Sequence, residues 1–149
     1  MAGPALVDSK VARGKAAFHA ILPALAFLIG GTTGAAVAGF TGVLMALSVV
    51  GGPRFSMIGL LFRNVVRPLF RIGPGKPEEV APHRFAEALG AIMLLAAGAI
   101  GLSGGPDALW RGISLLVAAL AALNWLAGIC VGCQMYLLVK RMSARKVAA

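Results

Sequence analysis

The stretch AAFHAILPALAFLIGGTTGAAVAGFTGVLMALSVVG, residues 16–51, decides the fold class of this chain. It lies within a run of 38 residues, between Lys15 and Arg54, that contains no Asp, Glu, Lys or Arg. As a single helix, this stretch would be about 54 Å long, well beyond the roughly 30 Å of a bilayer's hydrocarbon core. The turn-forming sequence Gly-Gly-Thr-Thr-Gly, which begins at Gly30, divides it near the middle. We therefore predict two transmembrane helices joined by a tight turn, at about 14–30 and 35–51.

Two further stretches lack charged residues, one of 19 residues before Asp107 and one of 28 residues before Lys140. A helix on the surface of a soluble core would carry charges on its solvent face every few positions. About 20 apolar residues suffice to span a bilayer, so the two stretches predict helices at about 85–102 and 109–139. Hydrophobic residues make up 59% of the 149 positions and charged residues only 13%. We predict one all-α domain, a polytopic membrane protein with four transmembrane helices.

The net charge of +9 follows membrane topology rather than the pattern of a nucleic-acid-binding protein. With four spans, both ends of the chain and the 52–84 segment share one side of the membrane. That side holds 13 of the 14 Lys and Arg residues, all except Arg111. Because Lys and Arg are enriched in cytoplasmic segments, we predict a bacterial inner-membrane protein with both termini in the cytoplasm. Its surroundings are then the lipid bilayer, and no nucleic-acid partner is expected.

Residues 55–72 differ from the predicted spans because cations interrupt their apolar pattern. Arg63, Arg67 and Arg71 are spaced four residues apart and so lie on one face of a helix. Large apolar side chains fill much of the remaining surface. This pattern is typical of an amphipathic helix in the membrane interface, with its cations toward anionic headgroups. We predict such a helix between the second and third spans.

Cys130 and Cys133 are the only cysteines of the chain and the only residues whose pattern suggests chemistry. On one continuous fourth helix they would share a face with Gln134. Counted back from Lys140, Cys133 would lie about 10 Å and Cys130 about 15 Å from the inner membrane boundary. Thiols that face the cytosol are kept mainly reduced, so a permanent structural disulfide is not expected. We take the two cysteines as the catalytic candidates.

Three interpretations of this cysteine pair remain open. Cysteine packs like a small hydrophobic residue, so the pair could simply fill space beside neighbouring glycines. The pair could instead be a redox-active or sulfur-handling dithiol, which needs a nearby cation to favour the thiolate. Metal binding needs ligands beyond two thiolates, so no metal site is predicted. The candidate supporting residues are the cations Arg63 and Arg67 and the polar residues Asn124 and Gln134.

Several segments resemble a known bacterial membrane family. They are Val7-Asp8, Pro53-Arg54-Phe55, Gly59-Leu60-Leu61-Phe62-Arg63, Val66-Arg67-Pro68, Pro82-His83-Arg84-Phe85-Ala86, Leu123-Asn124 and residues 130–138. Together they look like the family catalogued as domain of unknown function 4395. The resemblance implies a small four-helix membrane protein with a C-x-G-C motif in its last helix. It also implies a frequently acidic residue after the second cysteine, where this chain has Gln134. The family name implies no activity.

We expect thiol–disulfide or sulfur-transfer chemistry through the cysteine pair. Because the chain has no second pair, it must exchange electrons or sulfur with a thioredoxin-like or rhodanese-like protein, or with a quinone. A quinone is the one cofactor considered, and the sequence does not require it. The alternative is a non-catalytic accessory or assembly subunit of a larger complex, in which small residues contact other membrane subunits. The glycines that suggest such contacts are Gly39, Gly42, Gly98, Gly101, Gly128 and Gly132.

Overall fold

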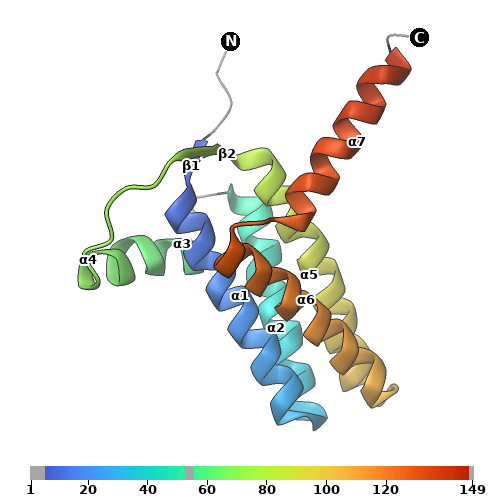
Figure 1. Ribbon diagram of the computed structural model, residues 1–149. Helices are drawn as coiled ribbons and strands as arrows, with labels where there is room; N and C mark the ends of the chain where they lie inside the picture. The colour runs from blue at the N-terminus through green and yellow to red at the C-terminus, as the bar shows by residue number, and fades with distance from the viewer. Residues whose placement is uncertain (1–5, 53–55, 148–149) are drawn as a thin grey trace.

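A computed structural model describes residues 6–52 and 56–147 of the chain. Its body is a bundle of four long helices that run alongside one another (Figure 1). Each is long and apolar enough to cross a membrane: α1 (Ser9–Ile29), α2 (Gly31–Gly51), α5 (Val80–Leu102) and α6 (Asp107–Ala127). The predicted all-α fold with four spans is confirmed. Such helices imply a lipid bilayer, because many of their exposed side chains are large and apolar. Their backbone polar groups are satisfied within each helix, which allows them to lie in lipid.

The turn between α1 and α2 depends on Gly30. Its φ angle is 67°, and its N–H donates a hydrogen bond to the carbonyl of Ala26 at 3.1 Å. Glycine adopts positive φ without the steric cost that a side chain would bring. Because the turn is this short, α2 begins at Gly31 rather than at the predicted position 35. At its other end α1 begins at Ser9 rather than at 14, since the side chain of Asp8 caps it.

Facing glycines bring α2 and α5 together. A Cβ atom built on Gly98 would lie 2.6 Å from the Cα atom of Gly39. One built on Gly42 would lie 2.8 Å from the backbone nitrogen of Leu95. Small residues allow two membrane helices to approach this closely. Several glycines that suggested a surface for other subunits therefore pack the chain's own helices against each other.

A short helical segment leaves the bundle between α2 and α5 and lies beside it (Figure 1). It consists of α3 (Met57–Leu61), the π-helical turn η2 (Phe62–Val66) and α4 (Arg67–Leu69). The buried ring of Phe62 packs on Gly14 of α1, where a Cβ atom would collide with it. The predicted helix at 55–72 is thus shorter, and its first residue lies outside the described part of the chain. Its location in the membrane interface stays a prediction.

A two-stranded antiparallel sheet joins the loop that follows this helical segment to the start of α1. It pairs β1 (Leu6–Asp8) with β2 (Pro77–Glu79), and neither strand was predicted because three residues show no periodicity. Asp8 also accepts a hydrogen bond from the N–H of Gly75 at 3.0 Å and pairs with Arg67 at 3.4 Å. Burial opposes the ionisation of Asp8, but the backbone hydrogen bonds and the Arg67 charge outweigh it, so the pKa of Asp8 is lowered. The ionised carboxylate therefore connects α1, the loop and α4.

The fourth span is shorter than the sequence predicts. Helix α6 ends at Ala127, where Gly128 adopts the left-handed conformation with φ of 69° and its N–H donates to the carbonyl of Asn124 at 3.0 Å. The chain resumes as α7 (Val131–Val147), which points away from the bundle in Figure 1. The predicted end near residue 139 is therefore wrong. Glycine is common at the position after the end of a helix. Here the sequence stays free of charged residues up to Lys140, so Gly128 did not stand out as the end of the span.

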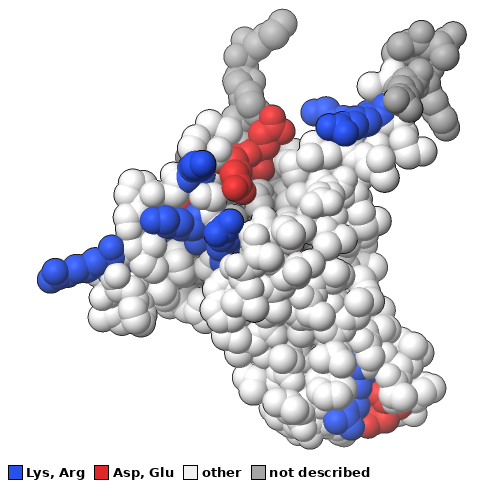
Figure 2. Space-filling model, viewed as in Figure 1, with Lys and Arg blue, Asp and Glu red and all other residues white. Residues whose placement is uncertain are grey.

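Charged side chains gather at the end of the bundle where α1 and α5 begin (Figure 2). A small charged group lies at the opposite end, where Asp107 and Arg111 of α6 pair at 3.3 Å. Arg111 also donates to the carbonyl of Phe27 at 2.8 Å, which joins the start of α6 to the end of α1. The separation of charge agrees with the four-span arrangement. Which end faces the cytoplasm stays a prediction from the excess of cations.

Candidate dithiol site

Cys130 and Cys133 lie at the start of α7, after the last of the four helices that are long and apolar enough to span a membrane. Cys130 directly precedes the helix, and Cys133 is its third residue. A disulfide joins them, with their Cα atoms 5.1 Å apart. The prediction of a continuous fourth helix through both cysteines is wrong, because α6 ends at Ala127 before reaching either of them. Their depth in the cytoplasmic leaflet stays a prediction.

The first two turns of α7 rest on the start of α5. A Cβ atom built on Gly132 would lie 2.6 Å from the Cβ atom of Ala86, so the two backbones approach closely. One turn further along, the rings of Tyr136 and Phe85 pack with centroids 5.6 Å apart. Gly132 therefore does act as a small packing residue, but between α7 and α5 of the same chain. This contact fixes the cysteine pair beside the first turn of α5.

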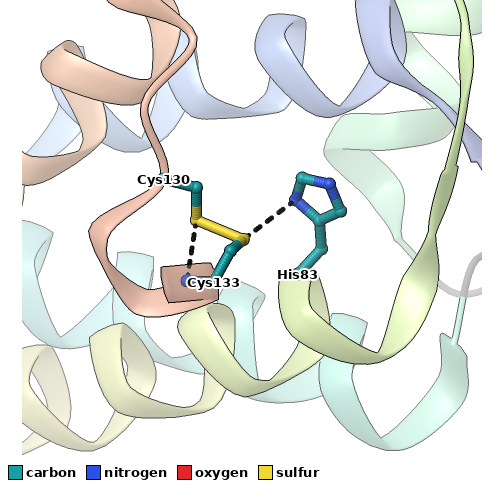
Figure 3. Close-up of side chains that lie close together, drawn as sticks. All are labelled: His83, Cys130 and Cys133. Carbon is teal, nitrogen blue, oxygen red and sulfur yellow. Dashed lines mark hydrogen bonds between the residues drawn. A yellow bond between two sulfur atoms is a disulfide. The ribbon is translucent and has the colours of Figure 1, made fainter. Parts of the chain in front are cut away.

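The start of α7 directs a peptide N–H group at the sulfur of Cys130. The N–H of Cys133 donates to Cys130 Sγ at 3.3 Å, as the close-up in Figure 3 shows. The first N–H groups of a helix have no partners within it, and the helix dipole favours negative charge at that end. When the disulfide is opened, this position favours Cys130 as the thiolate, which is the reactive form.

His83 of α5 faces the other sulfur. Its Nδ1 atom lies 3.8 Å from Cys133 Sγ, and its Nε2 atom lies 2.9 Å from a carboxylate oxygen of Glu78 in β2 (Figure 3 shows the first contact). A carboxylate partner at Nε2 favours the tautomer that carries its proton there, which leaves the lone pair of Nδ1 toward the sulfur. His83 and Glu78 can therefore accept a proton from the Cys133 thiol or return it.

The sequence did not single out His83 or Glu78 as site residues. They lie about fifty positions before the cysteines, and nothing in local spacing joins the two regions. The available signal was topological. In a four-span protein with both ends on one side, the start of the third span and the end of the fourth lie at the same end of the bundle.

The structure places Arg13, which was not chosen from the sequence, beside the motif and on the border of the same outer groove as both cysteines. A Cβ atom built on Gly128 would collide with the Arg13 guanidinium, so this group lies directly over the break between α6 and α7. Arg67 is held by Asp8 and donates to the carbonyl of Ile72 at 3.1 Å. Within the described part of the chain, no hydrogen bond or ion pair joins Arg63 or Arg67 to a cysteine. Arg13 in the first span thus replaces them as the candidate that favours a thiolate.

The two predicted polar neighbours take different positions. Asn124 is half-buried in the last turn of α6, where its backbone carbonyl accepts the N–H of Gly128. The residue borders both of the hollows beside the cysteine pair. Gln134 is exposed on α7 and borders only the outer hollow. Neither contacts a sulfur atom through a hydrogen bond in the described residues, so both are bordering residues.

The cysteine pair lies between two hollows. An outer groove of about 300 Å³ is bordered by both cysteines, Glu78 and Arg13. An inner cavity of about 540 Å³ extends among the membrane-spanning helices and is bordered by Cys130 but not by Cys133. The residues common to both hollows are Ala12, His83, Asn124 and Cys130. Cys130 is therefore accessible from two sides of different polarity.

His83, Cys130 and Cys133 form the one cluster with metal-ligand geometry that the described residues contain. The two Sγ atoms and a ring nitrogen of His83 lie within 4.8 Å of one another. Two thiolates and an imidazole are a donor set that zinc accepts, and a carboxylate behind the imidazole is a common second-sphere arrangement. The sequence offered only the two thiolates. His83 adds a third donor that the reduced pair could use, and the absence of a metal stays a prediction.

Comparison with known families accounts for nearly the whole chain. The family model described as Domain of unknown function (DUF4395) matches residues 7–141. The chain belongs to this family. The resemblance noted from the sequence is thereby confirmed, and the matched region contains the complete cluster of Glu78, His83, Cys130 and Cys133. No curated protein and no solved structure matches the chain. The DUF4395 family carries no stated activity, so function must be argued from the site.

Proposed function

We propose that this protein catalyses thiol–disulfide exchange through Cys130 and Cys133 with a thioredoxin-like protein. The observation that carries the proposal is the arrangement of the pair. One cysteine precedes a helix and accepts an N–H, the other faces a histidine backed by a carboxylate, and both border an outer groove. Two cysteines that merely filled space would need neither a hydrogen-bonded histidine nor access from outside.

The exchange proceeds in two steps when the protein starts oxidised. A thiolate of the partner attacks Cys130 Sγ, the Cys130–Cys133 bond breaks, and a mixed disulfide forms at Cys130. Cys133 leaves with the electron pair and receives a proton from protonated His83. The partner's second thiol then attacks its own sulfur in the mixed disulfide, and Cys130 leaves as a thiolate at the start of α7. The partner becomes a disulfide, and the proton of its second thiol returns to His83. This protein thereby gains two electrons and one proton, and it ends with Cys133 as the thiol and Cys130 as the thiolate.

The histidine and the helix terminus serve different sulfurs. A thiol is a better leaving group when it can be protonated or stabilised as the anion. His83 lies at the sulfur that leaves first, and the N–H of Cys133 lies at the sulfur that leaves second. In the reverse direction neutral His83 accepts the proton of Cys133, which can then attack the mixed disulfide.

The excess of Lys and Arg at the end that carries the site supports a cytoplasmic location for the exchange. Thioredoxin-like proteins keep dithiols reduced in that compartment. The accessory-subunit alternative has lost part of its support, because Gly39 and Gly98 pack within the chain. The apolar exposed side chains of α7 still offer a surface for another membrane subunit: Met135, Leu137, Leu138, Val139 and Met142.

Trapping of the mixed disulfide tests the proposal. The Cys133→Ser variant is incubated with a thioredoxin that retains one active-site cysteine, activated as a mixed disulfide with thionitrobenzoate. It should accumulate a covalent adduct at Cys130, because thionitrobenzoate leaves and no second thiol remains to break the new disulfide. The Cys130→Ser variant is the matched control and should form at least tenfold less adduct, since Cys133 has no N–H that favours its thiolate. Non-reducing electrophoresis with mass spectrometry of the linked peptide identifies the site. Absence of adduct with both variants, together with wild-type protein that thioredoxin fails to reduce, would contradict the proposal.

A further inference from the structure

The inner cavity has no part in the exchange proposed above. It extends between α1, α2, α3, α5 and α6, and Cys130 stands at its border. Its volume of about 540 Å³ is within the usual range for a bound small molecule, roughly 300–1,000 Å³. Most of its wall is apolar, with side chains such as Met45, Met93, Val117 and Leu120.

One wall of the cavity carries a polar cluster contributed by three different spans. Lys15 of α1 pairs with Glu87 of α5, and Ser48 of α2 lies between them. Ser48 accepts from Lys15 at 2.9 Å and donates to Glu87 at 2.8 Å. The Lys15 and Glu87 side chains are only 14% and 15% exposed. Ionisable groups within membrane spans are costly and commonly mark a ligand or ion site.

His19 adds an unpaired polar ring to the same wall. The residue is 5% exposed and lies one turn after Lys15 on α1. Among the hydrogen bonds of the described residues, none uses the His19 ring, and the residue borders the cavity. The His19 nitrogens are not among the sealed side-chain atoms that lack a partner in the described residues, so they are open to the cavity and can take a partner there. A ligand with an oxygen atom in the cavity would provide one.

The electrons gained by the cysteine pair also need an acceptor. The chain contains only these two cysteines, so it has no second pair to which electrons could pass. Cys130 borders the apolar cavity as well as the outer groove, whereas Cys133 borders only the groove. An acceptor in the cavity must be soluble in the bilayer, take two electrons and two protons, and carry polar oxygens on an otherwise apolar molecule.

We propose that the inner cavity binds a quinone of the bilayer, which the reduced Cys130–Cys133 pair converts to the quinol. The redox step rests on the exchange function proposed above. The thiolate of Cys130 adds to the quinone ring, and Cys133 then attacks Cys130 Sγ and expels the reduced ring. One S–S bond forms, while the S–H bond of Cys133 and the bond between Cys130 Sγ and the ring are broken. The two electrons, the proton of Cys133 and one proton from protonated His83, which also borders the cavity, end on the quinol, whose oxygens are hydrogen-bonded by the polar wall.

The experiment uses the full chain in lipid nanodiscs, with ubiquinone-1 as the probe. Protein reduced with dithiothreitol and freed of reductant is mixed with ubiquinone-1 without oxygen. We expect one quinol per protein and complete re-formation of the disulfide. The Ala121→Phe substitution places a ring in the cavity from α6 and should lower the rate at least tenfold. Ala119→Phe on the same helix is the matched control, because Ala119 is exposed and does not border the cavity, and it should reduce quinone normally.

Two further measurements separate binding from electron transfer. Binding of ubiquinone-1 to the Cys130→Ser/Cys133→Ser variant should match the wild type, whereas His19→Phe should weaken it about tenfold through loss of a hydrogen bond. Thermal unfolding checks that each variant is folded. A wild type that exchanges with thioredoxin but forms no quinol would overturn this inference and leave the proposed function standing. Lack of binding to the double-serine variant, or equal rates for Ala121→Phe and Ala119→Phe, would overturn it independently of thiol activity.

Discussion

At the scale of single residues, the site is defined by the two sulfurs having unlike surroundings. Cys130 accepts a peptide N–H at the start of α7, and Cys133 faces Nδ1 of His83. In a dithiol that cycles, one thiol must be reactive as the anion while the other is protonated and deprotonated. This division of roles explains why a histidine with a carboxylate partner is found beside the second cysteine.

Removal of the histidine or its carboxylate should slow exchange. His83→Phe keeps a planar ring but cannot transfer a proton, and we expect the rate of reduction by thioredoxin to fall about a hundredfold, the lower end for general acid–base catalysis. Glu78→Gln should lower it about tenfold, because the His83 tautomer is then less well fixed. Stopped-flow kinetics at neutral pH measure both.

Glu79→Gln is the control for Glu78→Gln, because it removes the adjacent exposed carboxylate, which forms no hydrogen bond or ion pair with His83 in the described residues. Its rate should equal that of the wild type. An unchanged rate in His83→Phe would contradict the role given to the histidine.

At the scale of elements, the break between α6 and α7 creates the site. A continuous helix through residue 130 would carry the cysteines along the α6 axis and away from the start of α5. Gly128 permits the break, since its φ is 69° and the Arg13 guanidinium occupies the position of a side chain. The distribution of charge could not predict this break, because no charged residue marks the end of the span before Lys140. The glycine and the excessive length of the apolar run were the available signals.

Gly128→Ala should therefore damage both fold and site. The left-handed conformation costs an alanine about 1 kcal/mol more than a glycine, and displacement of Arg13 adds to that cost. We expect a lower unfolding temperature and a rate of exchange with thioredoxin reduced at least fivefold. Gly112→Ala is the control, because Gly112 is helical and a Cβ atom there meets nothing within 4 Å. That variant should be as stable as the wild type or slightly more so, since alanine favours helix. Equal behaviour of the two variants would contradict the importance of the break.

At the scale of the whole molecule, the four-span arrangement brings distant segments to one end. The starts of α1 and α5 and the end of α6 meet there, which joins Arg13, His83 and Cys130. Charge-free runs and the one-sided distribution of cations were enough to predict four spans. The site itself was only half predictable: the cysteines stand out as a sequence motif, whereas His83, Glu78 and Arg13 become partners through tertiary contacts that no local pattern records. The same holds for the inner cavity, whose polar wall combines Lys15, Ser48 and Glu87 from three spans.

The most direct test of the account is alkylation of the two cysteines in native membranes with a reagent that adds a large mass to each free thiol. Inside-out vesicles are treated with thioredoxin, its reductase and reductant, or left untreated, before labelling without detergent. We predict no mass shift in untreated vesicles and addition of two tags after thioredoxin treatment, which would show a dithiol that cycles at the cytoplasmic face. Labelling that appears only after denaturation, with or without thioredoxin, would show that the cysteines are inaccessible packing residues and would contradict the central claim.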